Sequence, residues 1–158
     1  MICQRVITIL IVLIGLCASG CVWPVKIEGT AMRPTLADGD RWLVTLNPGE
    51  LQRGDIIVFR YPKDETKQYV KRIVGLPGET IEIRDGLVYI NGVALPEGYV
   101  PAETNKSRTS FPEKRIPEDN YFVIGDNRDN SSDSRYWGTV DKTLIEGKLY
   151  SRYFEGKN

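Results

Sequence analysis

The 158-residue chain carries 21 basic and 21 acidic side chains, so no charge excess points to a nucleic-acid partner. It contains no histidine, which excludes a Ser-His-Asp triad, a Cys-His pair and a zinc site with histidine ligands. The three cysteines, Cys3, Cys17 and Cys21, lie in or beside the apolar N-terminal segment. The rest of the chain therefore has no disulfide and no thiol nucleophile, and we expect no metal and no cofactor.

The chain begins with an uncharged, largely aliphatic segment, residues 6–25. As a helix it would span about 30 Å, the thickness of the hydrocarbon core of a bilayer, so we interpret residues 1–26 as a single-pass membrane anchor. Two other interpretations stay open. The small residues Ala18-Ser19-Gly20 suit signal-peptide cleavage, and a lipid on Cys21 would make the chain a lipoprotein. All three place the rest of the chain on the far side of the membrane.

From residue 27 onward, short apolar runs separated by turn signals predict β-strands. The predicted strands are residues 41–46, 55–59, 69–74, 80–83, 87–90, 121–124 and 148–154. Asp85-Gly86 between two of them is a typical two-residue hairpin turn. Residues 96–117 are polar and are expected to form an exposed excursion between core strands. The pattern predicts one all-β domain, residues 27–158, mainly antiparallel and open or barrel-like.

Four segments stand out in this domain: EGTAMRPTL (28–36), RGDIIVF (53–59), YVKRIVGLPGE (69–79) and GDNRDNSSDSRYWG (125–138). The first resembles the nucleophile box of the type I signal peptidases, Ser-Met-x-Pro-Thr-Leu, with Ala31 in the serine position. The third resembles the box that carries the catalytic lysine of that family, and the other two resemble its remaining boxes. The four occur in the order typical of the family, which makes the resemblance specific.

The resemblance implies a serine endopeptidase with a Ser/Lys dyad, which removes signal peptides from secreted preproteins. It implies that Lys71 is the general base, that Ser131 hydrogen-bonds and orients the lysine amine, and that Asp126 supports the site. It also implies a structural pair of Asp133 and Arg135 beneath the site. By the same carry-over, the residues that line the substrate pocket are Ile27, Gly29, Met32, Leu36, Tyr69 and Val70.

The partners that the resemblance implies are signal peptides and a lipid bilayer, with no nucleic acid and no metal. The location that it implies is a bacterial-type cytoplasmic membrane, with the catalytic domain on the extracytoplasmic side. Substrate recognition would resemble β-augmentation, in which an extended peptide pairs with exposed strand edges.

Lysine acts as a base only when neutral, and its ordinary pKa is about 10.4. Burial among apolar groups lowers the pKa of an amine. On a strand, Tyr69, Lys71 and Ile73 share one face, so we expect the Lys71 amine to be buried. Arg72 lies on the opposite face, where an ordinary exposed cross-strand residue is expected.

A methyl group cannot attack a carbonyl, so with Ala31 the chain is expected to be inactive or to trap its substrate. The adjacent residue Thr30 carries a hydroxyl, but adjacent strand residues point to opposite faces, so we do not expect Thr30 to replace the missing serine. The alternative is a non-catalytic protein that binds signal peptides or partners a working peptidase. Taken alone, residues 126–133 could also be a surface turn or a calcium loop, although the glycine and glutamate of such a loop are missing.

Overall fold

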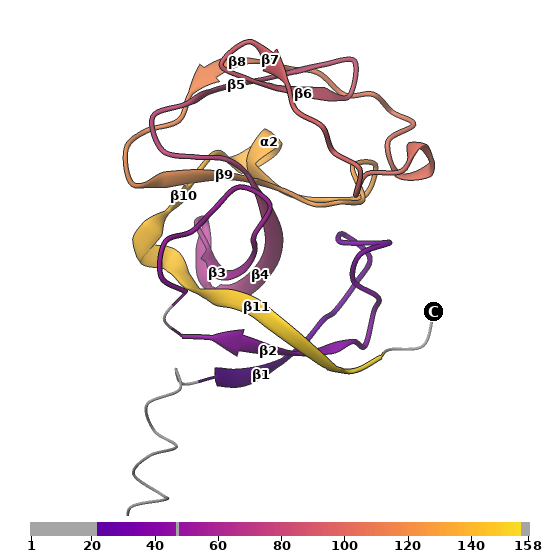
Figure 1. Ribbon diagram of the computed structural model, residues 1–158, viewed down its shortest axis with the longest axis vertical. Coiled ribbons are helices and arrows are strands. Elements are labelled where there is room, and N and C mark those ends of the chain that lie inside the picture. The colour runs from indigo at the N-terminus through magenta and orange to yellow at the C-terminus, as the bar shows by residue number, and fades with distance from the viewer. Residues whose placement is uncertain (1–21, 47, 156–158) are drawn as a thin grey trace, which may run out of the picture.

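The computed structural model describes residues 22–46 and 48–155, which form two antiparallel sheets (Figure 1). The larger sheet has the strand order β1-β2-β11-β3-β4-β9-β10, and the smaller has the order β7-β6-β5-β8. The strands of the larger sheet are β1 (Val22–Lys26), β2 (Arg41–Thr45), β3 (Ile56–Tyr61), β4 (Asp64–Gly75), β9 (Asn120–Ile124), β10 (Val140–Asp141) and β11 (Ile145–Phe154). The strands of the smaller sheet are β5 (Thr80–Arg84), β6 (Leu87–Ile90), β7 (Val93–Ala94) and β8 (Phe111–Arg115).

The helices of the described residues are single turns: η2 (Ala102–Thr104), α2 (Ser134–Trp137) and η3 (Lys142–Leu144). In this part of the chain no helix is long and apolar enough to cross a membrane. The predicted anchor, residues 1–26, lies mostly outside the described residues. Its last residues are different from the prediction, because Val22–Lys26 forms β1 and pairs with β2 in a regular antiparallel register. The β domain therefore includes residues that we assigned to the anchor.

The all-β, mainly antiparallel prediction is confirmed, and each of the seven predicted strands is present. The hairpin turn is also confirmed, because Asp85 and Gly86 both have positive φ and Arg84 pairs with Leu87. Residues 96–117 are mostly exposed, as expected, but they are more ordered than an excursion. Phe111–Arg115 forms β8 and pairs with β5, and the side chain of Ile116 is fully buried.

The C-terminal part of strand β4, residues 71–75, lies at the centre of the core because it is buried on both faces. Ile73 packs with Ile57 and Phe59 on one face, and Val74 packs with Ile81 among others on the opposite face. Figure 1 shows β4 between the smaller sheet and the end of the larger sheet that β1, β2 and β11 form. Two adjacent residues of this strand, Lys71 and Arg72, are consequently both buried.

Gly147 on β11 is a position where the chain has no room for a side chain. A Cβ there would collide with the backbone carbonyl of Thr45 and with the side chain of Val44 on the adjacent strand. We expect Gly147→Ala to lower the free energy of unfolding by about 1–3 kcal/mol, as overpacking of a core typically does. Urea unfolding measures this. Gly98→Ala is the matched control, since a Cβ there meets no atom within 4 Å, and equal effects of the two changes would contradict the packing argument.

Candidate active site

A cavity of about 440 Å³ lies where the end of β1 approaches the middle of β4. Its lining residues are Val25, Lys26, Ile27, Glu28, Gly29, Ala31, Met32, Val58, Gln68, Tyr69, Val70, Lys71 and Ser132. Five of the six predicted substrate residues are among them. Leu36 is the exception and corrects the prediction: its side chain is fully buried behind the cavity, where it packs with Ile27 and Met32.

Lys71 brings its amine to this cavity from β4. The strand register is fixed by β3, where Ile57 lies opposite Lys71. The side chain is only 6% exposed, and its Nζ donates a hydrogen bond to the carbonyl of Val70 at 2.9 Å and lies 5.2 Å from the ring centroid of Tyr69. Burial lowers the pKa of Lys71 to about 8, against the opposing attraction of Asp133. Near neutral pH most of this amine is still protonated, but its neutral fraction is much larger than that of an ordinary lysine.

Ala31 lies in the turn after Gly29, and its backbone is fixed by the last of the four motifs. The amide of Asn127 donates to the carbonyl of Ala31 at 3.0 Å, and the Asn127 side chain donates to the carbonyl of Thr30 at 3.1 Å. The hydroxyl of Thr30 accepts a hydrogen bond from Asn130 at 2.8 Å. Both residue 31 and Lys71 thus line one cavity, and they come from segments far apart in the sequence.

Ser131 departs from the role that the resemblance implied. The Lys71 amine donates to Val70, and Ser131 Oγ is buried with no hydrogen-bond partner among the described residues. Ser131 instead packs against Gly125, where a Cβ would collide with Ser131 Oγ and with the carbonyl of Ala31. The next residue, Ser132, lines the cavity, whereas Ser131 does not.

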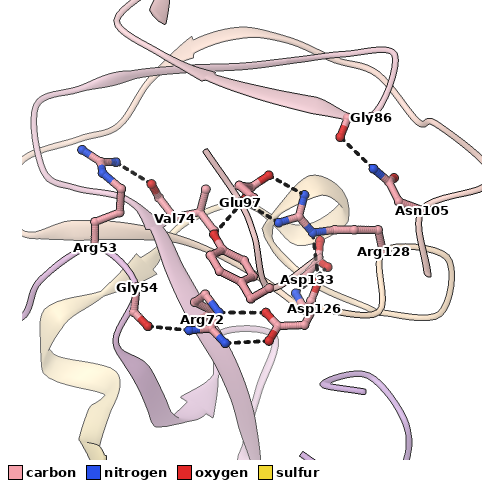
Figure 2. A network of polar contacts seen from close by, with 12 residues as sticks. Arg53, Gly54, Arg72, Val74, Gly86, Glu97, Asn105, Asp126, Arg128 and Asp133 are labelled. Atoms are coloured by element: carbon pink, nitrogen blue, oxygen red, sulfur yellow. Dashed lines mark hydrogen bonds and ion pairs between the residues drawn. The ribbon is translucent and has the colours of Figure 1, made fainter. Parts of the chain in front are cut away.

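Arg72 is the second correction, because it is buried rather than an exposed cross-strand residue. Its side chain is 10% exposed, and it forms a bidentate ion pair with the fully buried Asp126. Figure 2 shows the two side chains facing each other, with Gly54 beside them. The face prediction failed because β4 is covered on both sides.

Asp133 and Arg135 form a second buried pair, with Arg135 Nε and Nη2 donating to the carboxylate at 2.8 and 2.9 Å. Asp133 also accepts the amide of Gly125 at 3.2 Å. Two further residues that sequence reasoning missed, Glu97 and Tyr99, belong to the same polar region. Neither lies in a recognisable motif, so the sequence held no signal for them.

The described residues contain no group of three or more histidine, cysteine, aspartate or glutamate side chains that could hold a metal ion. The groups that line the cavity include the buried Lys71 amine and residue 31.

Comparisons with known proteins agree on one family. The family model described as signal peptidase, peptidase S26, matches residues 2–154. A signal peptidase I from Bacillus licheniformis is 37% identical over 142 residues, which cover 83% of this chain and 76% of that protein. A signal peptidase I from Bacillus amyloliquefaciens is 37% identical over 154 residues, covering 90% of this chain and 82% of that protein. The probable signal peptidase I-2 of Synechocystis is 36% identical, and the match covers only 61% of its length.

Among solved structures, the crystal structure of a signal peptidase I from Enterococcus faecalis V583 is similar, with a TM-score of 0.55 and 39% sequence identity. The match covers 65% of this chain and 99% of that chain. The chain therefore belongs to the signal peptidase family, peptidase S26. By family it is a serine endopeptidase.

The lowered pKa of Lys71 predicts a stability effect. At pH 7 a buried amine with a pKa of about 8 is mostly protonated, at a cost of up to about 3 kcal/mol relative to an exposed lysine. We therefore expect Lys71→Met to raise the free energy of unfolding at pH 7. Because the ordinary pKa is 10.5, the unfolded chain binds more protons between pH 8 and 10.5, and the unmodified chain gains stability as the pH rises there.

The difference between the two chains should therefore narrow from pH 7 to pH 10, as measured by urea unfolding. Lys67→Met is the control, since Lys67 lies on the same strand with its side chain 63% exposed. A Lys71→Met chain that is no more stable at pH 7, or a difference that does not change with pH, would contradict the buried-amine interpretation.

Proposed function

We propose that this chain is a membrane-attached signal peptidase scaffold, which binds the cleavage region of signal peptides but cannot hydrolyse them while residue 31 is alanine. The observation that carries the proposal is that Lys71 and Ala31 line the same cavity. A buried amine that shares a cavity with residue 31 supports the role of a lysine general base.

With a serine at position 31, the chemistry follows from this arrangement. Neutral Lys71 would accept the hydroxyl proton while the oxygen attacks the scissile carbonyl, and the backbone N–H of residue 31 would donate to the developing oxyanion. The protonated amine would then return its proton to the leaving amine. Water, activated in the same way, would release the acyl group. With alanine the first step has neither an attacking oxygen nor a proton to transfer.

Substrate binding by strand addition is supported by free strand edges beside the cavity. β4 pairs with β9 from Arg72 onward, so within the described strands the edge at Gln68–Val70 has no partner on that side. β1, on the other side of the cavity, is the edge strand of its sheet. An extended peptide between these edges could hydrogen-bond with both and place small side chains toward the cavity.

Attachment to a bilayer is supported by the exposed side chains of the β1–β2–β11 end of the sheet. The large hydrophobic residues exposed there are Val22, Leu46, Tyr150, Tyr153 and Phe154. Tyrosine and apolar side chains are typical of the membrane–water interface. In the proposed arrangement this end rests on the extracytoplasmic leaflet, and the cavity lies close to the point where a signal peptide leaves the membrane.

The alternative function is a non-catalytic protein that captures signal peptides or partners a working peptidase. Ala31 itself favours it, because a methyl side chain cannot attack a carbonyl. The two functions share the binding step and differ in whether a single oxygen atom at residue 31 creates turnover.

Ala31→Ser is expected to create cleavage of preproteins after small residues, because Lys71 is the proposed base and the backbone N–H of residue 31 is the proposed oxyanion donor. The rate should rise by several orders of magnitude, on the order of the 10⁶-fold that the loss of such a nucleophile typically costs. kcat/KM should increase with pH up to about 8 and then level off, as Lys71 loses its proton. Cleavage of a preprotein with a purified membrane-inserted chain measures this.

In the Ala31→Ser background, Lys71→Ala should abolish cleavage, and Lys67→Ala on the exposed part of the same strand should not. Arg72→Ala is unsuitable as a control, because it would leave the buried carboxylate of Asp126 without its partner. An Ala31→Ser chain that folds but cuts no preprotein would contradict the catalytic proposal and favour the non-catalytic function.

The unmodified chain is expected to bind signal peptides and to release them uncut, with an affinity close to that of Ala31→Ser before turnover. The cavity walls and strand edges do not depend on the missing hydroxyl. Binding to chain-containing vesicles, followed by mass spectrometry of the recovered peptide, tests this. Efficient cleavage by the unmodified chain would contradict the proposal and point to another hydroxyl, such as that of Ser132.

A further inference from the structure

Residues 97–104, which we call the clamp segment, contact residues that support the active site. Two of its side chains reach into the polar region between β4 and the turn that follows β9. Figure 2 shows Glu97 facing Arg128 above the pair of Arg72 and Asp126. Neither Glu97 nor Tyr99 lines the cavity.

Tyr99 covers the face of the Arg72 guanidinium, which lies 4.1 Å from the ring centroid. The edge of the same guanidinium is already used in the plane, by Asp126 and by the carbonyl of Gly54 at 2.8 Å. The ring therefore shields one face of the guanidinium from water and adds a cation–π attraction. Arg72 is the direct neighbour of Lys71 on β4, so the position of one backbone sets that of the other.

Glu97 contacts Arg128, which lies in the turn after β9. Its carboxylate accepts the Tyr99 hydroxyl at 2.7 Å and both terminal nitrogens of Arg128 at 2.6 and 3.0 Å. The side chains of Glu97 and Arg128 are 9% and 3% exposed, so little water competes for this pair. Arg128 Nε in turn donates to the carbonyl of Gly125.

The turn that Arg128 holds is the one that fixes residue 31. The amide of Asn127 donates to the carbonyl of Ala31, and Thr104 at the end of the clamp segment donates to the carbonyl of Asp126 at 3.3 Å. The clamp segment is thus connected through one contact to the strand of the base and through another to the backbone of residue 31.

We propose that Tyr99 and Glu97 are positioning residues of the active site, which hold the Lys71 strand and the turn that fixes residue 31 in their catalytic arrangement. Where it concerns turnover, this inference rests on the proposed function. A displacement of about 1 Å in such an arrangement can lower a rate about 100-fold without a change in binding contacts. The alternative is that both residues contribute only to the overall stability of the fold.

The first test uses hydrogen exchange in the unmodified chain, where no activity is needed. Tyr99→Leu keeps an apolar side chain but removes the ring and the hydroxyl. We expect the amide of Asn127, which bonds to Ala31, to exchange at least tenfold faster. The amide of Asn91, which bonds to the carbonyl of Thr80 in the smaller sheet, should be unchanged. Glu97→Gln, which keeps its shape and loses its charge, should also accelerate Asn127.

The second test measures kcat and KM in the Ala31→Ser background. Tyr99→Leu should lower kcat at least tenfold and leave KM within twofold, because neither residue lines the cavity. Tyr99→Phe keeps the ring over Arg72 and should restore most of kcat. Tyr89→Leu is the matched control, since Tyr89 lies under the Arg84 guanidinium at 3.6 Å in the smaller sheet, and it should change neither constant.

The outcomes separate the hypotheses. Equal acceleration of the Asn127 and Asn91 amides would overturn the proposal in favour of a role in global stability. An effect of Tyr99→Leu no larger than that of Tyr89→Leu, in exchange or in kcat, would overturn it as well. If Ala31→Ser never cuts a preprotein, the proposed function fails, and the exchange data alone still decide whether the clamp segment holds residue 31.

Discussion

The ion pair of Arg72 and Asp126 is the interaction on which the rest of the site depends. A buried pair of this kind is stable only when its remaining hydrogen-bonding groups are satisfied, because both charges have lost their water. Here the Arg72 guanidinium donates to the carbonyl of Gly54, and the carboxylate accepts the hydroxyl of Thr35. Thr35, Gly54, Arg72 and Asp126 come one each from the four sequence motifs. The four motifs therefore meet at a single buried charge pair.

Strand β4 carries two adjacent cationic side chains, Lys71 and Arg72, whose pKa values are shifted in opposite directions. Burial disfavours the charged form of both side chains. Among the described residues Lys71 forms no ion pair, and the attraction of Asp133 only partly offsets burial, so the pKa falls to about 8. For Arg72 burial also acts to lower the pKa, but the hydrogen bond and charge of Asp126 outweigh it and the pKa is raised. Asp126 therefore fixes the position of β4 by pairing with Arg72, and it does not stabilise the charged form of Lys71 by an ion pair.

Sequence reasoning predicted the strands and the hairpin turn because alternation and turn residues are local signals. It failed where the outcome depends on what covers a segment. Arg72 was expected to be exposed because alternation gives two faces but does not reveal that a second sheet covers the other face. Val22–Lys26 was assigned to the anchor because an uncharged apolar run is common to a membrane helix and to an edge strand. Ser131 was assigned by resemblance to the lysine amine, which bonds to Val70 instead.

The polar composition of residues 125–135 has a physical cause that the sequence alone left open between a surface turn and a calcium loop. Lys71 stands on a strand whose position is fixed by backbone pairing, but residue 31 and the turn after β9 have no such ladder. Buried backbone groups outside a ladder need partners from side chains. Asn127 and Arg128 supply them to Thr30 and Gly125, and Arg135 supplies one to the carbonyl of Arg128. The carboxylates of this segment serve as partners for arginines and backbone amides, so they are already occupied by the protein itself.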